Sequence, residues 1–115
     1  MPMHARLRSA FGQELASARA AEAREDCDRA WHHLERAHVL AQRFAWPHLR
    51  VHGRMFGFAW RHTDAWEALG QIARIALAAP GSWTGRAPLG NTGGADVGIF
   101  TPMEIPADLA ALLEA

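Results

Sequence analysis

The sequence predicts an all-α protein, either an antiparallel four-helix bundle or two packed helical hairpins, followed by an irregular C-terminal tail and a short terminal helix. Residues 5–79 contain few helix breakers and are rich in Ala, Leu, Arg and Glu, which favour helices. Residues 80–106 hold four of the six prolines and six of the ten glycines, which excludes a long helix or a regular sheet there. The 115 residues, 50% of them hydrophobic, suffice for a single domain over 1–115 with one core.

Local signals place the helix ends. A charged segment at 25–28 separates the first two helices, and Pro47 suits the first turn of a helix better than an interior. Asp64, with Glu67 three residues later, is typical of a helix N-terminus. We therefore expect helices at 5–24, 27–44, 47–62, 65–79 and 106–114, with the tail at 80–115 wrapping the bundle.

Helical periodicity separates arginine from histidine on the predicted helix 47–62. At about 100° per residue, three arginines share one narrow face. These are Arg50, Arg54 and Arg61. The opposite face carries His48, His52, Met55, Ala59 and His62. With the arginines in solvent, the histidines face the interior.

Two other predicted helices carry polar groups on their apolar faces. In helix 27–44, His38 lies within the apolar arc, which also contains Cys27, and Glu35 lies at its edge. In helix 5–24, Glu14 lies in the middle of the apolar stripe, and a carboxylate in that position needs a partner. We expect the other three histidines, His4, His32 and His33, to lie at the surface.

The fourth helix is interpreted as structural. Its predicted buried side consists of Trp66, Leu69, Ile72, Ala73, Ala76 and Leu77. Its predicted solvent side consists of Glu67, Gln71 and Arg74. The aromatic residues are expected in the core, namely Trp31, Trp46, Phe56, Phe58, Trp60 and Trp66.

A metal site is predicted between the second and third helices. If these form an antiparallel hairpin, His38 lies level with His52, and His48 lies one turn nearer the connection. An i, i+4 histidine pair grips an ion from one face, and Glu35 and His38 have the i, i+3 spacing of bundle metal sites. The proposed ligands are His38, His48, His52, Glu35 and Glu14, with Met55 and His62 in support.

Zinc is the first candidate metal, because neutral imidazoles with carboxylates suit it. Copper is the second, through Met55, and iron, cobalt or nickel also suit such ligands. Three interpretations stay open. The site binds a metal for storage or sensing, or it is a small metalloenzyme in which Glu14 or Glu35 acts as a base. Alternatively, the protein is a helical interaction module whose histidines form only a buried polar network.

Composition narrows the class of partner. The 12 basic residues, all arginines, are balanced by 12 acidic ones. The chain therefore lacks the excess positive charge that is typical of proteins that bind nucleic acids or anionic membranes. The single cysteine excludes an internal disulfide, and no apolar run has the length of a signal peptide or a membrane span. We therefore expect a cytoplasmic protein, and five tryptophans with an apolar tail indicate surface for a homodimer.

Three segments carry a family resemblance. They are the run from Trp31 to Gln42, which contains LERAH, then Pro47, His48 and His52, and finally 90–94, which reads GNTGG. Together they resemble domain-of-unknown-function family 3703 (DUF3703) over nearly the whole chain. The resemblance implies a compact bacterial protein without an assigned activity, whose genes tend to accompany metal-resistance determinants. The first four helices also look like two tetratricopeptide-type hairpins, which would imply a peptide-binding module.

Overall fold

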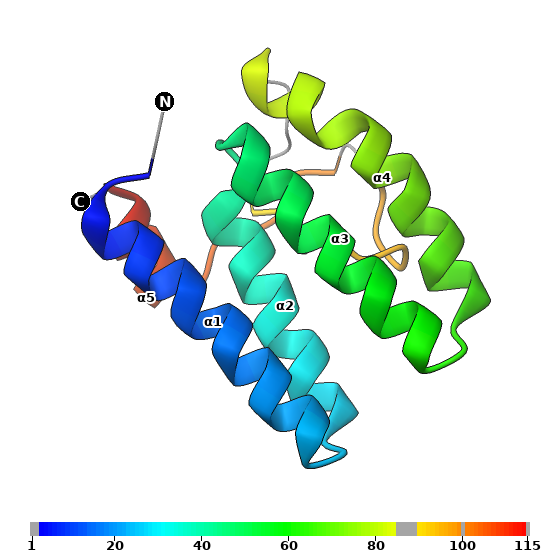
Figure 1. Cartoon of the computed structure of the whole chain (residues 1–115). Helices are drawn as coiled ribbons and strands as arrows, with labels where there is room; N and C mark the ends of the chain where they lie inside the picture. Colours follow the sequence, from blue (N-terminus) through cyan, green and yellow to red (C-terminus); the bar gives the residue numbers. More distant parts are fainter. Residues whose placement is uncertain (1–2, 85–89, 100, 115) are drawn as a thin grey trace.

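The computed structural model describes residues 3–84, 90–99 and 101–114, and these residues form an all-α fold (Figure 1). The predicted fold class is confirmed. The parts of the predicted tail at 85–89, 100 and 115 lie outside the described residues. The helices are α1 (Ala5–Ala23), α2 (Cys27–Ala41), α3 (Ala45–Arg61), α4 (Ala65–Trp83) and α5 (Ala107–Glu114).

The four long helices form two hairpins, α1–α2 and α3–α4, which lie side by side with α2 against α3 (Figure 1). The short α5 returns to the first hairpin and packs against α2 and α1. Residues 90–98 pass between α2 and α4 and bond to both helices. The metal-site histidines predicted on α2 and α3 therefore lie where the two hairpins meet.

The two hairpins turn in the same way. Each turn holds a non-glycine residue in the left-handed region, Glu25 with φ 62° and Thr63 with φ 55°. The next residue is an aspartate, Asp26 or Asp64, whose side chain accepts a hydrogen bond from the backbone N–H three residues later. This arrangement closes one helix and caps the next within three residues. The N-cap predicted at Asp64 is confirmed.

The helix ends differ from expectation around the prolines. α3 begins at Ala45, so Pro47 is its third residue, where no intrahelical N–H donor is needed. α4 continues through Pro80 to Trp83 rather than ending near residue 79. The added turn carries Ser82, whose hydroxyl donates to the Gln42 carbonyl at 2.6 Å. A tertiary contact thus accompanies the helical turn beyond the proline.

The apolar core lies between the first hairpin and α3. Its fully buried side chains include Leu7 of α1, Leu40 of α2 and Met55 of α3. Trp31 packs beside Phe58 with 5.6 Å between ring centroids, joining α2 to α3. The core is therefore built without the apolar side of α4.

The orientation predicted for α4 was wrong. Gln71 is 0% exposed and Arg74 is 9% exposed, whereas Trp66 is 74% exposed. The reason is that the polar side of α4 supplies hydrogen bonds to the histidines and to residues 90–98. The prediction that the aromatic residues lie in the core was also wrong for Trp46 and Trp60 of α3, which are exposed.

Within the part of the chain that the structure describes, none of the helices combines the length and the apolar character that a bilayer span requires.

Candidate metal centre

Three histidine side chains converge between α2 and α3. His38 comes from α2, and His48 and His52 come from successive turns of α3. Each of the three Nε2 atoms lies 3.1 Å from the other two. The residues are 2%, 6% and 2% exposed, so the three nitrogens form a nearly equilateral triangle in the protein interior.

Regular helix geometry explains this convergence. His48 and His52 lie four residues apart and project from the same face of α3. His38 lies near the end of α2, and the short turn between α2 and α3 brings it opposite that face. Arg50 is exposed, as the periodicity predicted, whereas Arg54 is only partly exposed and lines a cavity against α1.

Two of the imidazoles have their tautomers set by oxygen acceptors. His38 Nδ1 lies 2.6 Å from the Asn91 carbonyl, which can only accept. His48 Nδ1 lies 2.9 Å from Ser82 Oγ, whose own proton goes to the Gln42 carbonyl. Both Nδ1 atoms therefore carry the ring proton, and both Nε2 atoms present lone pairs.

Gln71 of α4 sets the third tautomer. Its Nε2 donates to Glu67 Oε2 at 2.9 Å and to the Gly93 carbonyl at 2.7 Å, and both of these groups are acceptors. Its Oε1 therefore accepts from His52 Nδ1 at 2.6 Å. The His52 Nε2 atom is left as a third lone pair aimed at the other two.

Burial keeps the imidazoles neutral. Desolvation lowers the pKa of His48 to about 4 and, with a contribution from His48, that of His52 to about 3. Desolvation also lowers the pKa of His38 well below its usual value, and the two neighbouring histidines add to the effect. At neutral pH the triangle therefore contains three lone pairs and no proton between them.

Residues 90–98 form a strap over His38. Asn91 folds this strap by donating to the Gly98 and Thr101 carbonyls and by accepting from the Gly93 N–H. Gly93 has φ +87°, and a Cβ there would lie 2.6 Å from the His38 ring. Only glycine fits this backbone conformation and this close approach.

The geometry of the three nitrogens fits a metal ion. An ion bound at about 2.05 Å by tetrahedrally arranged nitrogens separates them by about 3.3 Å, close to the spacing seen. Hydrogen bonds from the outer ring nitrogens to oxygen acceptors are typical of metal-ligating histidines. Among the described residues, the ligand group contains these three histidines and neither a carboxylate nor a thiolate.

Glu14 lies apart from this group, contrary to expectation. It is buried, and its carboxylate accepts from Arg36 Nε at 2.7 Å and lies 3.3 Å from His33 Nδ1. Arg36 also pairs with Asp108 of α5. Because α1 packs against α2, the Glu14 carboxylate meets Arg36 of α2 rather than the histidines.

Glu35 lies on the other side of α2. Its pKa is raised to about 7, first by desolvation and then by the charges of Asp96 and Glu67. Its carboxylate lies 4.0 Å from His32 Nδ1, and it is not part of the histidine group. Glu35 therefore lies within electrostatic reach of Asp96 in the strap and Glu67 of α4, and outside the histidine group.

The two supporting residues have other surroundings. Met55 is part of the apolar core. His62 is the C-cap residue of α3. Its Nε2 lies 2.9 Å from Glu22 Oε2, and its Nδ1 lies 3.7 Å from the Cys27 sulfur.

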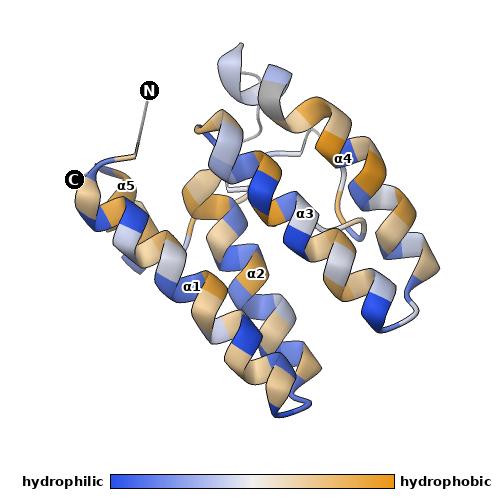
Figure 2. Cartoon of the chain, in the orientation of Figure 1, coloured by the Kyte–Doolittle hydropathy of each residue, from blue (hydrophilic) through white to orange (hydrophobic). Residues whose placement is uncertain are grey.

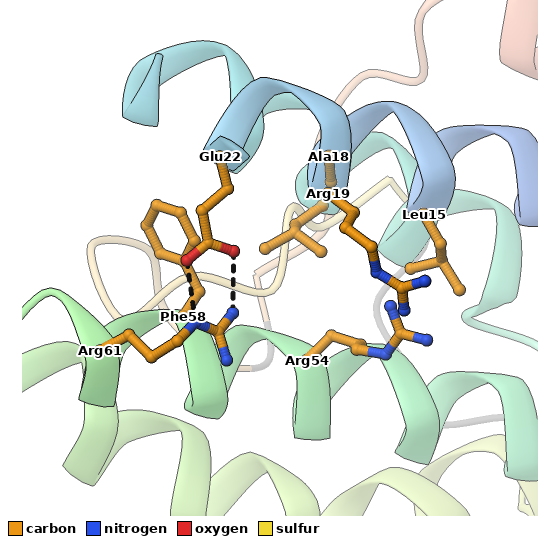
Figure 3. A pocket seen from close by; sticks show the side chains of 8 residues that line it. Leu15, Ala18, Arg19, Glu22, Arg54, Phe58 and Arg61 are labelled. Atoms are coloured by element: carbon orange, nitrogen blue, oxygen red, sulfur yellow. Dashed lines mark hydrogen bonds and ion pairs between the residues drawn. The ribbon is translucent and has the colours of Figure 1, made fainter. Parts of the chain in front are cut away.

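A cavity of about 340 Å³ between α1 and α3 differs from the histidine group in the charge of its lining (Figure 3). Glu22 accepts there from Arg61 at 2.8 and 2.9 Å, and the Arg19 and Arg54 side chains extend toward one another (Figure 3). Desolvation and the neighbouring arginines lower the pKa of Arg54. A cavity lined by three arginines and one already paired carboxylate does not suit a cation.

Sequence reasoning missed the outer hydrogen-bond partners of the histidines. Gln71 was assigned to solvent, Ser82 lies beyond the proline that was expected to end α4, and Asn91 lies in the segment predicted as an irregular tail. The polar residues Glu67, Gln71 and Arg74 share one face of α4, and this was the available signal. This polar face can be interpreted as buried only when the strap is known to lie against it.

The fold and the site together define a class: a helical-hairpin protein with a buried group of three converging imidazoles. The chain belongs to the family DUF3703, described as a protein of unknown function, whose model matches residues 5–113. The predicted family is thus confirmed. No curated protein and no solved structure gives a significant match.

Proposed function

We propose that this protein binds one transition-metal ion through His38, His48 and His52, and that it acts in the metal homeostasis of the cytoplasm. Zn²⁺ is the first choice of ion, because three neutral imidazoles suit it. Copper is the second choice, although the position of Met55 in the apolar core does not favour it. Iron, cobalt and nickel are also compatible with imidazole ligands.

One observation carries the proposal: three Nε2 lone pairs face one another at 3.1 Å, with every ring proton committed to an oxygen on the outside. Without a cation these lone pairs repel, and desolvation makes the repulsion costly. A structural polar network would place a donor opposite each acceptor. A cation at the centre satisfies all three nitrogens at once.

The three-residue ligand group has a functional consequence. Structural zinc sites usually have four protein ligands, whereas sites with three keep one position for water or another small ligand. Such an ion is exchangeable and suits transfer or sensing. It also favours the second candidate function, a small metalloenzyme, because an open position is what metal-activated water requires.

The test is a titration of untagged, chelator-treated protein with Co²⁺, followed by its visible absorption spectrum and by displacement with Zn²⁺. We expect one equivalent to bind and to raise the thermal midpoint by roughly 10 °C at saturating metal. The double variant H38L/H52L should lose binding and stay folded by circular dichroism, since leucine replaces buried polar groups with apolar ones.

The matched control is H32L/H33L, which removes two histidines of α2 outside the group and should bind metal like the parent chain. Failure of the parent chain to bind zinc, cobalt, nickel or copper would overturn the proposal. Equal loss of binding in both double variants would overturn the ligand assignment.

A further inference from the structure

The outward side of the second hairpin is apolar and exposed. Trp60 of α3 and Trp66 of α4 are 72% and 74% exposed, and Leu69 is 65% exposed. Ile72, Leu77 and Trp83, further along α4, are also exposed, and the Trp83 ring lies 6.4 Å from that of Trp46 of α3. In Figure 2 the hydrophobic colours run along much of α4. We call these six residues, without Trp46, the α4 face.

The charges of α4 point away from this face. The helix has two charged residues, Glu67 and Arg74. Glu67 accepts from the Ala95 N–H at 2.8 Å, and Arg74 donates to the Gly70 and Val97 carbonyls. Both are therefore engaged at the strap side and do not project from the α4 face. The charged side chain that lines the groove beside this face is Asp64, the N-cap of α4.

The α4 face contains a hollow as well as projecting side chains. A groove of about 600 Å³ lies between α3 and α4, with walls that include Phe56, Trp60, Leu69 and Ile72. Trp66 stands beside it on the first turn of α4. A surface with both a projecting indole and an apolar hollow can be complementary to itself, as a two-fold interface requires.

The area also matches a dimer. Bulky side chains of this kind bury roughly 150–250 Å² each when aromatic, so the six together amount to on the order of 800 Å². That is about what each partner contributes to a standard protein interface. Single exposed apolar residues are ordinary, but a group of large exposed apolar side chains with this total area marks an interaction site.

We propose that two copies of this chain form a symmetric dimer through the α4 face, with Trp66 of each copy seated in the groove of the other. The dimer does not depend on the metal site, because the histidines contact the opposite side of α4 through Gln71 and Ser82. The residue expected to matter most is Leu69, which is both exposed and part of the groove wall.

The test is sedimentation equilibrium of the full chain, with and without metal. We expect a species of twice 12.6 kDa at micromolar concentration. The variant L69E puts a charge into the apolar wall of the groove that receives the indole, and it should raise the dimer dissociation constant at least about 100-fold. Its circular dichroism and its Co²⁺ titration should match those of the parent chain, which separates loss of the dimer from loss of the fold.

The matched control is A16E, which puts the same charge on an exposed position of α1 and should leave the dimer intact. A parent chain that is monomeric at 100-fold higher concentration, about 100 μM, contradicts the proposal, as does an L69E variant that dimerises like the parent. If the parent chain stays monomeric and binds neutral lipid vesicles, the α4 face is a membrane-binding surface, and the dimer proposal is overturned.

Discussion

The two buried polar groups on either side of α2 are built in opposite ways. On the α1 side, Glu14 is paired with Arg36, so charge meets charge. On the α3 side, three neutral imidazoles face one another and have only oxygen acceptors behind them. The first group is complete within the protein. The second has lone pairs aimed at a common centre, which the proposed cation would complete.

Removing one imidazole has the largest expected effect on this contrast. The variant H48L should weaken Zn²⁺ binding by more than about 100-fold, because outer partners of ligands alone account for about 10–100-fold. The variant R36Q on the other side of α2 should leave the affinity unchanged. Competition with a chromophoric chelator measures both, and equal affinities for the parent chain and H48L would contradict the ligand role.

The second-largest effect is expected on removing a hydrogen-bond acceptor behind a ligand. In the variant Q71L, His52 Nδ1 loses its acceptor and the ring loses its fixed tautomer, so Zn²⁺ affinity should fall by about 10–100-fold. Q13L, at an exposed glutamine of α1, is the matched control. The same competition assay applies, and an unaltered affinity in Q71L would show that Gln71 does not orient the imidazole.

The charged group should affect stability and leave metal affinity unaltered. The variant E14Q leaves Arg36 without its partly buried carboxylate and should lower the free energy of unfolding by about 1–2 kcal/mol. Urea denaturation measures this change. A parallel loss of Zn²⁺ affinity would mean that the two sides of α2 are coupled, contrary to the comparison.

The smallest effect is a pH dependence at Glu35. Its pKa is about 7 in the folded chain against an ordinary 4.5, so its contribution to stability is full below pH 4.5 and is lost as the pH rises through 7. The side chain is 23% exposed, and water screens part of this effect. The variant E35Q should gain roughly 1 kcal/mol over the parent chain at pH 8 and little at pH 4. Urea denaturation at the two pH values checks the difference.

Helical periodicity predicted the histidine triangle. It gave the inward face of each helix, and the three histidines lie on two consecutive helices joined by a short turn. It failed for Glu14, since a helical wheel gives a face without naming the neighbour that the face meets. It failed more fully for α4, where an apolar stripe was assumed to point inward. There, the strap at 90–98 recruits Gln71 and Arg74, and its path depends on long-range contacts that local sequence does not encode.

The most direct test of the metal-binding claim is the zinc K-edge X-ray absorption fine structure of the zinc-loaded protein. Three imidazole nitrogens at about 2.0–2.1 Å and one further light-atom ligand are expected, with no sulfur neighbour. A sulfur shell at about 2.3 Å would instead implicate Cys27 or Met55. That result, a shell with fewer than three imidazoles, or a protein that does not load zinc would contradict the assignment of His38, His48 and His52.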